Sequence, residues 1–304
     1  MISAAVIEAL KEIVPADKVL LQEPMKLHTT FRIGGPADCL VYLENEEQLC
    51  KIQKYLRLVD VPYTVIGNGS NLLVSDQGYA GIVLVVGKHM SRIEVKDCYL
   101  EAEAGALMSQ VAKAAKEHGL TGLEFAAGIP GTIGGGAVMN AGAYGGEMKD
   151  IVQNVTVLTR EGEIRELEKE ELGFGYRASV IKDRGYVVLG AELMLVPGDK
   201  EKILARMQEL KNKRVEKQPL EYPSAGSAFK RPEGYFAGKL VMDAGLSGYA
   251  VGGAKVSEKH CGFLINAGGA TASDVMELIR QIQAKVKEQF GVQLEPEIQF
   301  LGEF

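Results

Sequence analysis

The sequence predicts a turn-rich fold of the β or α/β class that is divided into domains, and three features support this. Glycine is abundant, with 36 residues in a chain of 304, which is typical of architectures with many turns between strands. Residues 38–74 show the pattern of a strand, an amphipathic helix and a second strand. Pro219 and Pro223 follow a basic helical segment and interrupt the pattern, which places a domain boundary near residues 200–220.

Composition and charge exclude several classes of protein. Hydrophobic residues make up 46% and charged residues 24% of the chain, as in ordinary globular proteins. The net charge of −6 argues against nucleic-acid partners. No apolar run reaches the ~18 residues of a membrane span, and residues 1–14 read as an amphipathic helix and not as a signal peptide. We therefore expect a cytoplasmic protein without membrane insertion.

Cysteine and histidine spacing argues against disulfides and metals. The four cysteines are scattered without a CxxC pair, which favours a reducing compartment. The four histidines show no HxH or HxxxH spacing, so no metal site is expected. These residues are Cys39, Cys50, Cys98, Cys261, His28, His89, His118 and His260.

The first quarter of the chain ends in a small polar loop. Gly34, Gly35 and Pro36 form a turn before the first strand of the strand–helix–strand unit. The unit's second strand runs into GNGSN (67–71), which opens onto apolar residues 72–74 and not onto a helix, unlike a dinucleotide-binding fingerprint. The loop is either a phosphate-binding turn or an ordinary connection. The elements expected here are a helix at 3–13, a strand at 38–43, a helix at 46–57 and a strand at 63–66.

The middle of the chain contains a long glycine-rich loop, residues 122–146. Nine of its 25 residues are glycine, and Glu124 is its only charged residue, so it is not a solvated linker. Glycine lets another group lie directly on the main chain, and successive N–H groups bind anions. The loop is therefore a candidate cradle for a phosphate-bearing ligand, with tight turn packing as the alternative. Around it we expect strands at 82–86, 91–95, 99–104, 151–159 and 163–167, one strand or a strand pair at 185–196, and a helix at 107–118.

Three polar features lie far apart in the remaining sequence. Arg177 stands among Phe174 and Tyr176, where it is either functional or stacked on an aromatic ring. Ser227 lies in a small polar turn that is followed by basic residues. Glu295 and Glu297 are two residues apart, so they share a face if the segment is a strand undisturbed by Pro296. Helices are expected at 200–217, 235–243 and 272–290, the last with a Thr271/Asp274 capping box.

A ligand cradle together with scattered Arg, Ser and Glu suggests an enzyme whose chemistry belongs to a nucleotide cofactor. A nucleotide-binding regulatory module is the non-enzymatic alternative.

Seven stretches, in order along nearly the whole chain, resemble the UDP-N-acetylenolpyruvoylglucosamine reductase family, FAD enzymes of peptidoglycan synthesis. The stretches are TTFRIGGPAD (29–38), VIGNGSNLLV (65–74), GLEFAAGIPGTIGGGAVMNAGAYGGEM (122–148), FGYRASV (174–180), YPSAGSAFKRP (222–232), LINAGGATASDV (264–275) and LEPEIQFLG (294–302). With 304 residues and no additional segment between 180 and 220, the chain resembles the short form that lacks the tyrosine loop.

The resemblance implies an FAD-binding domain of the vanillyl-alcohol-oxidase/p-cresol-methylhydroxylase type, followed by an α+β substrate-binding domain. It places the first domain at residues 1–200, with subdomains of about 1–75 and 76–200, and the second at 201–296. Residues 297–304 would return to the first subdomain.

The resemblance also implies non-covalent FAD and NADPH as co-substrate. The residues that it assigns to FAD are Gly67, Asn68, Gly69, Ser70, Asn71, Gly128, Ile129, Pro130, Gly131, Thr132, Gly134, Gly135, Ala137, Asn140 and Gly142.

The catalytic residues implied are Arg177, Ser227 and Glu297. NADPH would reduce FAD, whose N5 would then deliver hydride to C3 of the enolpyruvyl ether of the UDP-sugar. Arg177 and Glu297 would stabilise the enolate, and Ser227 would protonate C2. Lys230 and Tyr176 are the substrate-binding candidates. The alternative enzyme is another flavin oxidoreductase of the same fold, which oxidises an alcohol or hydroxy acid.

Overall fold

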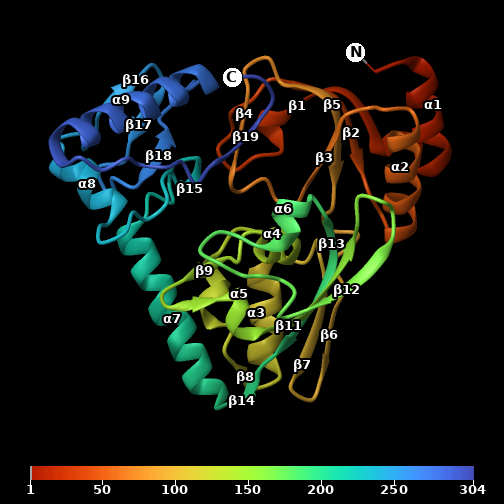
Figure 1. Cartoon of the computed structure of the whole chain (residues 1–304). Helices are drawn as coiled ribbons and strands as arrows, with labels where there is room; N and C mark the ends of the chain where they lie inside the picture. The colour runs from red at the N-terminus through yellow and green to blue at the C-terminus, as the bar shows by residue number, and fades with distance from the viewer. Residues whose placement is uncertain (1) are drawn as a thin grey trace.

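The computed structural model describes residues 2–304 and shows three lobes, with one long helix running between two of them (Figure 1). Within the described residues, none of the helices combines the length and apolarity that crossing a lipid bilayer requires.

The first lobe is built on a four-stranded sheet with the order β1-β2-β5-β3. β2 and β5 are parallel, as are β3 and β5, while β1 is antiparallel to β2. The strands are β1 (Val19–Pro24), β2 (Pro36–Tyr42), β3 (Tyr63–Ile66) and β5 (Tyr79–Val85), and the helices are α1 (Ala4–Ile13) and α2 (Glu46–Leu58). The predicted subdomain limit near residue 75 lies before β5, whereas the first sheet extends to Val85; the domain limits as a whole remain a prediction.

The second lobe is an antiparallel sheet with the order β12-β11-β13-β7-β6. Its core is continuous with that of α1 and α2, because apolar residues of both lobes form a single buried cluster. The strands are β6 (Ile93–Lys96), β7 (Tyr99–Glu103), β11 (Val152–Leu158), β12 (Ile164–Glu168) and β13 (Val187–Met194), and the principal helices are α3 (Met108–Glu117), α4 (Ile133–Val138) and α6 (Val180–Arg184).

The third lobe packs two helices against a small sheet with the order β15-β18-β17-β16. Phe31, Ile33 and Leu73 belong to the first-lobe chain but are buried in the core of the third lobe, so the two lobes share an apolar interface. The elements are β15 (Ser224–Ser227), β16 (Ala250–Val251), β17 (Ala254–Val256), β18 (Phe263–Asn266), α8 (Ala237–Asp243) and α9 (Ala272–Phe290).

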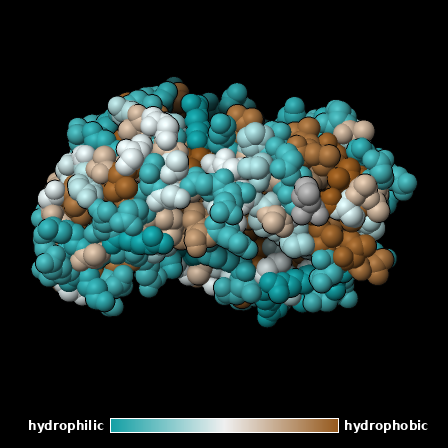
Figure 2. Space-filling model, turned by 90° about the horizontal axis from the view of Figure 1, so that it is seen from above, coloured by the Kyte–Doolittle hydropathy of each residue, from teal (hydrophilic) through white to brown (hydrophobic). Residues whose placement is uncertain are grey.

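Two connections bind the lobes together. The helix α7 (Lys200–Lys217) runs from the second lobe to the third along one side of the molecule (Figure 1). At the other end of the chain, β19 (Gln299–Leu301) pairs in parallel with β4 (Leu72–Val74) of the first lobe. Viewed from above, the third lobe is mainly hydrophilic, and apolar residues gather over the first lobe at the right (Figure 2).

Glu295 and Glu297 do not lie on a regular strand, so the condition under which they would share a face is not met. Pro296 makes only an isolated bridge with Phe229, and the regular strand begins at Gln299. The two side chains have different environments: Glu295 is exposed and pairs with Lys230, whereas Glu297 is buried against Arg177.

Candidate active site

A cavity of about 1290 Å³ lies where the three lobes meet. Both glycine-bearing loops form part of its wall, together with Arg177, Ser227 and Glu297. Segments that are distant in sequence therefore face one space, which is larger than the roughly 300–1,000 Å³ of typical small-molecule sites.

The GNGSN loop presents free main-chain donors to this cavity. The N–H groups of Asn68, Gly69, Ser70 and Asn71 make no hydrogen bond to any of the residues 2–304. Gly69 has φ +59°, and a Cβ there would lie 2.0 Å from the His28 carbonyl oxygen, so glycine is required at this position. A run of free N–H groups of this kind is a binding site for an anion such as phosphate.

In the second glycine loop, residues 122–146, the surroundings of two glycines show whether packing or backbone conformation requires glycine there. A Cβ on Gly135 would meet only Thr132 Oγ1 at 3.7 Å, and one on Gly131 would meet its nearest atom, Ser70 Oγ, at 3.6 Å. Neither residue has a positive φ, so neither packing nor backbone conformation requires glycine there. Because both residues line the cavity, the missing side chains leave the main chain open to a ligand. This fits an extended dinucleotide cofactor.

The two loops form one continuous wall. A Cβ on Gly67 would lie 2.4 Å from Thr132 Oγ1, so the loops are in direct contact. Asn68 Nδ2 donates a hydrogen bond of 2.5 Å to the Pro130 carbonyl oxygen. Thr132 also caps α4, because its Oγ1 accepts from the Gly135 N–H at 3.4 Å.

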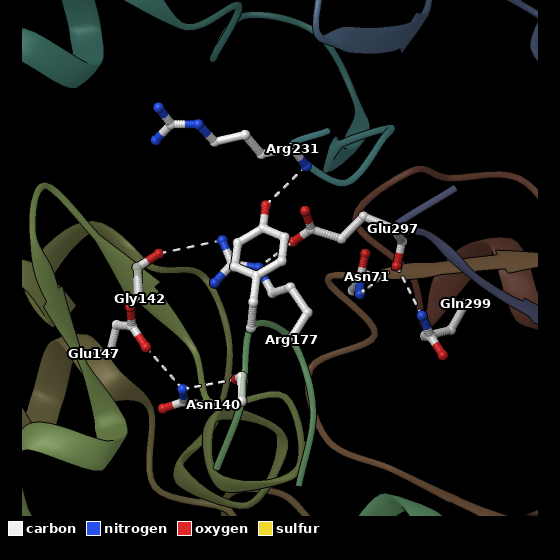
Figure 3. Close-up of polar contacts among 10 residues, drawn as sticks. Asn71, Asn140, Gly142, Glu147, Arg177, Arg231, Glu297 and Gln299 are labelled. Atoms are coloured by element: carbon white, nitrogen blue, oxygen red, sulfur yellow. Dashed lines mark hydrogen bonds and ion pairs between the residues drawn. The ribbon is translucent and has the colours of Figure 1, made fainter. Parts of the chain in front are cut away.

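Arg177 projects into the cavity from a strained turn before α6. Its φ is +55°, which is unfavourable for a residue with a long side chain, and such strain is often found at functional sites. Its Nε lies 2.5 Å from Glu297 Oε1, and its Nη2 donates to the Gly142 carbonyl oxygen at 3.4 Å (Figure 3). The guanidinium carbon is 5.2 Å from the centre of the Tyr176 ring. The arginine is thus fixed between the second glycine loop and the C-terminal segment.

Hydrogen bonds to the main-chain groups of Glu297 hold this residue in place. Asn71 Nδ2 and Gln299 Nε2 donate to its carbonyl oxygen at 3.2 and 2.7 Å (Figure 3). Its N–H donates to the Ala228 carbonyl oxygen at 2.8 Å. Burial raises the pKa of the Glu297 carboxyl above its ordinary value, while the charge and hydrogen bond of Arg177 act in the opposite direction. The carboxyl is therefore poised to change protonation state.

Ser227 ends β15 beside the same pair. Its neighbour Ala228 accepts the hydrogen bond from Glu297, and Ser227 itself lines the cavity. Within the described residues the Ser227 hydroxyl makes no hydrogen bond, so it is free to interact with a ligand. Arg177, Ser227 and Glu297 thus come together from three separate parts of the chain.

The structure places five of the predicted site residues outside the cavity wall, and their environments explain why. Asn140 is fully buried and bonded within the protein, Ala137 is in the core, and Gly128 is covered by Arg214. Tyr176 is half exposed, with its hydroxyl accepting from the Arg231 N–H at 3.0 Å, and Lys230 is paired with Glu295 at 3.1 Å. The remaining predicted residues line the cavity.

Arg214 lines the cavity as well, although its sequence context does not single it out. It donates to the Gly128 carbonyl oxygen and lies beside Tyr144, and burial lowers its pKa. The basic end of its helix has the charge pattern of a solvated face, so the sequence does not indicate that Arg214 lies in a cavity. Its position four residues after the buried Leu210 is the signal that places it on the inward side.

Two family models match separate parts of the chain. One described as the FAD binding domain matches residues 37–168, and one described as the C-terminal domain of UDP-N-acetylenolpyruvoylglucosamine reductase matches residues 218–301.

Full-length relatives carry the same name. The UDP-N-acetylenolpyruvoylglucosamine reductase of Agathobacter rectalis is 53% identical over 311 residues, which cover 98% of each chain. That of Caldanaerobacter subterraneus is 52% identical, again over 98% of each chain.

Solved structures agree at the level of the fold. The crystal structure of UDP-N-acetylenolpyruvylglucosamine reductase from Thermus caldophilus matches with a TM-score of 0.80 at 39% identity, covering 93% of this chain and 98% of that one. An alkyldihydroxyacetonephosphate synthase matches with a TM-score of 0.51 at 14% identity, covering 65% of this chain and 41% of that one. This second likeness concerns the fold alone.

Proposed function

Because the chain belongs to the UDP-N-acetylenolpyruvoylglucosamine reductase family, we propose that it reduces UDP-N-acetyl-3-O-(1-carboxyvinyl)-glucosamine to UDP-N-acetylmuramate. NADPH is the reductant, and the reaction is a cytoplasmic step of peptidoglycan synthesis. The observation that carries the proposal is the Arg177–Glu297 pair, which lies beside Ser227 in a cavity walled by two glycine loops.

The chain is an FAD-dependent oxidoreductase, with a vanillyl-alcohol-oxidase-type FAD-binding domain and a C-terminal α+β domain. We assign the cofactor diphosphate to the free N–H groups of residues 68–71 and the open main chain at Gly131 and Gly135. Bound FAD would supply the hydride chemistry that lets hydride from NADPH be added to C3 of the enolpyruvyl group.

Arg177 and Glu297 act on the substrate carboxylate. When hydride adds to C3, negative charge develops at C2 and spreads into the carboxylate as an enolate. The guanidinium of Arg177 stabilises that charge, and its fixed position means that little reorganisation is needed during the reaction. Glu297 in its protonated form donates a hydrogen bond to the same group, which the raised pKa of its carboxyl favours.

Ser227 completes the reaction by giving a proton to C2. One hydride at C3 and one proton at C2 saturate the double bond, and the serine regains its proton from solvent. A serine hydroxyl is a weak acid, so the donation depends on a basic enolate in a site from which water is excluded. The freedom of the Ser227 hydroxyl from protein hydrogen bonds supports this role.

Tyr176 and Lys230 stand at the edge of the site, outside the cavity wall. Their positions beside Arg177 and on the segment after Ser227 support a role in receiving the UDP-sugar. Lys230 would have to leave Glu295 to bind a phosphate, and their exposed pairing is weak enough to allow this.

The test is a flavin bleaching experiment. Purified protein should show visible flavin absorbance, which NADPH should bleach and the enolpyruvyl UDP-sugar should restore. Bleaching by an alcohol or hydroxy acid, with no response to NADPH, would instead support the alternative oxidase activity. Colourless protein that cannot be loaded with FAD would refute both readings.

A further inference from the structure

Asn140 lies in the glycine-rich loop but turns away from the cavity. It is completely buried, and its φ of +42° is a conformation that asparagine adopts more readily than most residues. Its Nδ2 donates to Glu147 Oε2 at 2.8 Å and to the Gly175 carbonyl oxygen at 2.9 Å. Because both amide hydrogens are used within the protein, neither is left for a cofactor.

The bond to Gly175 reaches the turn that carries Arg177 (Figure 3). Gly175 and Ala178 bridge across that turn, with Arg177 between them in its strained conformation. At the far end of the turn, Ser179 Oγ donates to the Val138 carbonyl oxygen at 2.7 Å. The turn is therefore fastened to the glycine-rich loop on both sides of Arg177.

The other contacts of Asn140 fix the amide itself. Its Oδ1 accepts from the Lys149 N–H at 2.9 Å, so the side chain cannot rotate without losing three hydrogen bonds. Lys149 and Asn140 both lower the pKa of Glu147, which keeps that acceptor anionic. The amide is thus held in one orientation, with Gly175 at one of its ends.

We propose that Asn140 is a positioning residue for Arg177: its amide holds the 175–178 turn and so sets the direction of the guanidinium relative to Glu297 and the reacting carbon. This inference rests on the proposed role of Arg177 in substrate reduction. A small displacement of a group that stabilises transition-state charge reduces the rate without preventing cofactor binding.

The test uses Asn140→Gly in the FAD-loaded enzyme. Glycine adopts the positive φ without strain, so the change removes the amide and leaves the backbone conformation favourable. Each half-reaction is followed by stopped-flow absorbance of the flavin. We expect full flavin content, reduction by NADPH within about twofold of wild type, and reoxidation by the substrate slowed about 10- to 100-fold, with kcat reduced and KM for NADPH unchanged.

A matched control is Asn154→Ala in β11. Asn154 also donates through its amide to a carboxylate, Glu192 Oε1 at 3.3 Å, but lies away from the cavity. Both half-reactions should be unaffected in this variant. Should Asn140→Gly fail to fold, Asn140→Ser gives the same test, because a serine hydroxyl has one hydrogen to donate and cannot hold Glu147 and Gly175 together.

The double variant Asn140→Gly/Arg177→Ala separates positioning from general destabilisation. If Asn140 acts through Arg177, its loss adds less than about twofold to the effect of Arg177→Ala. Independent, multiplying effects would overturn the inference, as would an equal slowing of both half-reactions or unchanged reoxidation in Asn140→Gly. If Arg177→Ala itself reoxidises at the wild-type rate, the proposed role of Arg177 fails instead.

Discussion

At the scale of single residues, the proposed chemistry depends on the buried pair of Arg177 and Glu297. Burial and the arginine shift the pKa of Glu297 in opposite directions. Burial raises the pKa of Glu297, and the neighbouring Arg177 partly reverses that shift. Buried ion pairs are weak evidence for stability, because desolvation offsets their attraction. We therefore attribute the pair to function: Arg177 supplies charge, and Glu297 supplies a carboxyl that can still bind a proton.

The first prediction concerns the pH dependence of Glu297. If the protonated carboxyl is the active form, substrate reduction should slow as pH rises through the folded-state pKa, which lies above the ordinary value of 4.5. Glu297→Gln donates at every pH, so this limb of the profile should disappear in the variant. A limb that persists in Glu297→Gln belongs to another group. The measurement is the rate of flavin reoxidation by substrate against pH.

The raised pKa of Glu297 also predicts how the free energy of unfolding changes with pH. Because the folded pKa of Glu297 is raised, its protonation favours the folded state below pH 4.5, and this contribution is lost as pH rises through the folded pKa. The free energy of unfolding of the wild type should therefore fall relative to Glu297→Gln over that window. Denaturant titrations at several pH values measure it, and a difference that grows in the opposite direction would contradict the shift.

At the scale of elements, one glycine from each loop illustrates two different reasons for glycine. Gly67 is required by contact with Thr132, whereas Gly135 faces the cavity with room for a side chain. The open space at Gly135 indicates that a ligand, and not packing, explains the glycine at this position.

The second prediction compares these two glycines. Gly135→Ala should leave the stability of the apo-protein unchanged or raise it by up to about 1 kcal/mol, because alanine favours the helix. Its affinity for FAD should fall by about tenfold, because the added methyl group occupies the ligand's space. Gly67→Ala should lower both. Thermal unfolding of apo-protein and FAD titration measure the two quantities, and unchanged FAD affinity in Gly135→Ala would remove that residue from the cofactor site.

Elements with strong local signals were predictable from sequence. The helices at 200–217 and 272–290 have the expected bounds, the latter because Thr271 and Asp274 form the predicted capping box. Residues 185–196, expected as one strand or a strand pair, form β13 and the short β14 (Val196–Pro197), which are separated at Leu195. The environments of Glu295 and Glu297 could not be predicted, because they depend on Lys230 and Arg177, which belong to distant segments.

The site was predictable to a similar extent. Its central residues follow from resemblance, since no local pattern links Arg177 to Glu297, which are 120 positions apart. The resemblance assigns Asn140 to FAD together with the glycine-rich loop, and only the three-dimensional structure shows that its amide points to Gly175. Side-chain direction within an irregular loop has no period that a sequence could reveal.

At the scale of the whole molecule, polar contacts reinforce the docking of the third lobe on the first. Asp76 accepts hydrogen bonds from the N–H groups of Ala272 and Ser273 at 2.6 and 2.9 Å, at the start of α9. Thr30 Oγ1 donates to the Ser224 carbonyl oxygen at 2.7 Å. These contacts place β15, and with it Ser227, over the first lobe.

The third prediction tests this docking with Asp76→Ala. The change leaves the first N–H groups of α9 without their acceptor, and we expect a loss of about 1–2 kcal/mol in the free energy of unfolding. Asp243→Ala is the matched control, because it removes only an exposed pair with Lys239 and should cost less than about 0.5 kcal/mol. Denaturant unfolding measures both, and equal effects would argue against a link between the lobes.

In the proposed mechanism, the glycine loops hold the cofactor, and residues from the other segments act on the substrate. The most direct measurement is the rate of each half-reaction in Ser227→Ala, in rapid mixing with NADPH and then with the enolpyruvyl UDP-sugar. The account predicts wild-type flavin content and reduction by NADPH, with reoxidation by the substrate slowed at least about 100-fold, as expected for loss of a proton donor. Equal slowing of both half-reactions, or reoxidation at the wild-type rate, would contradict it.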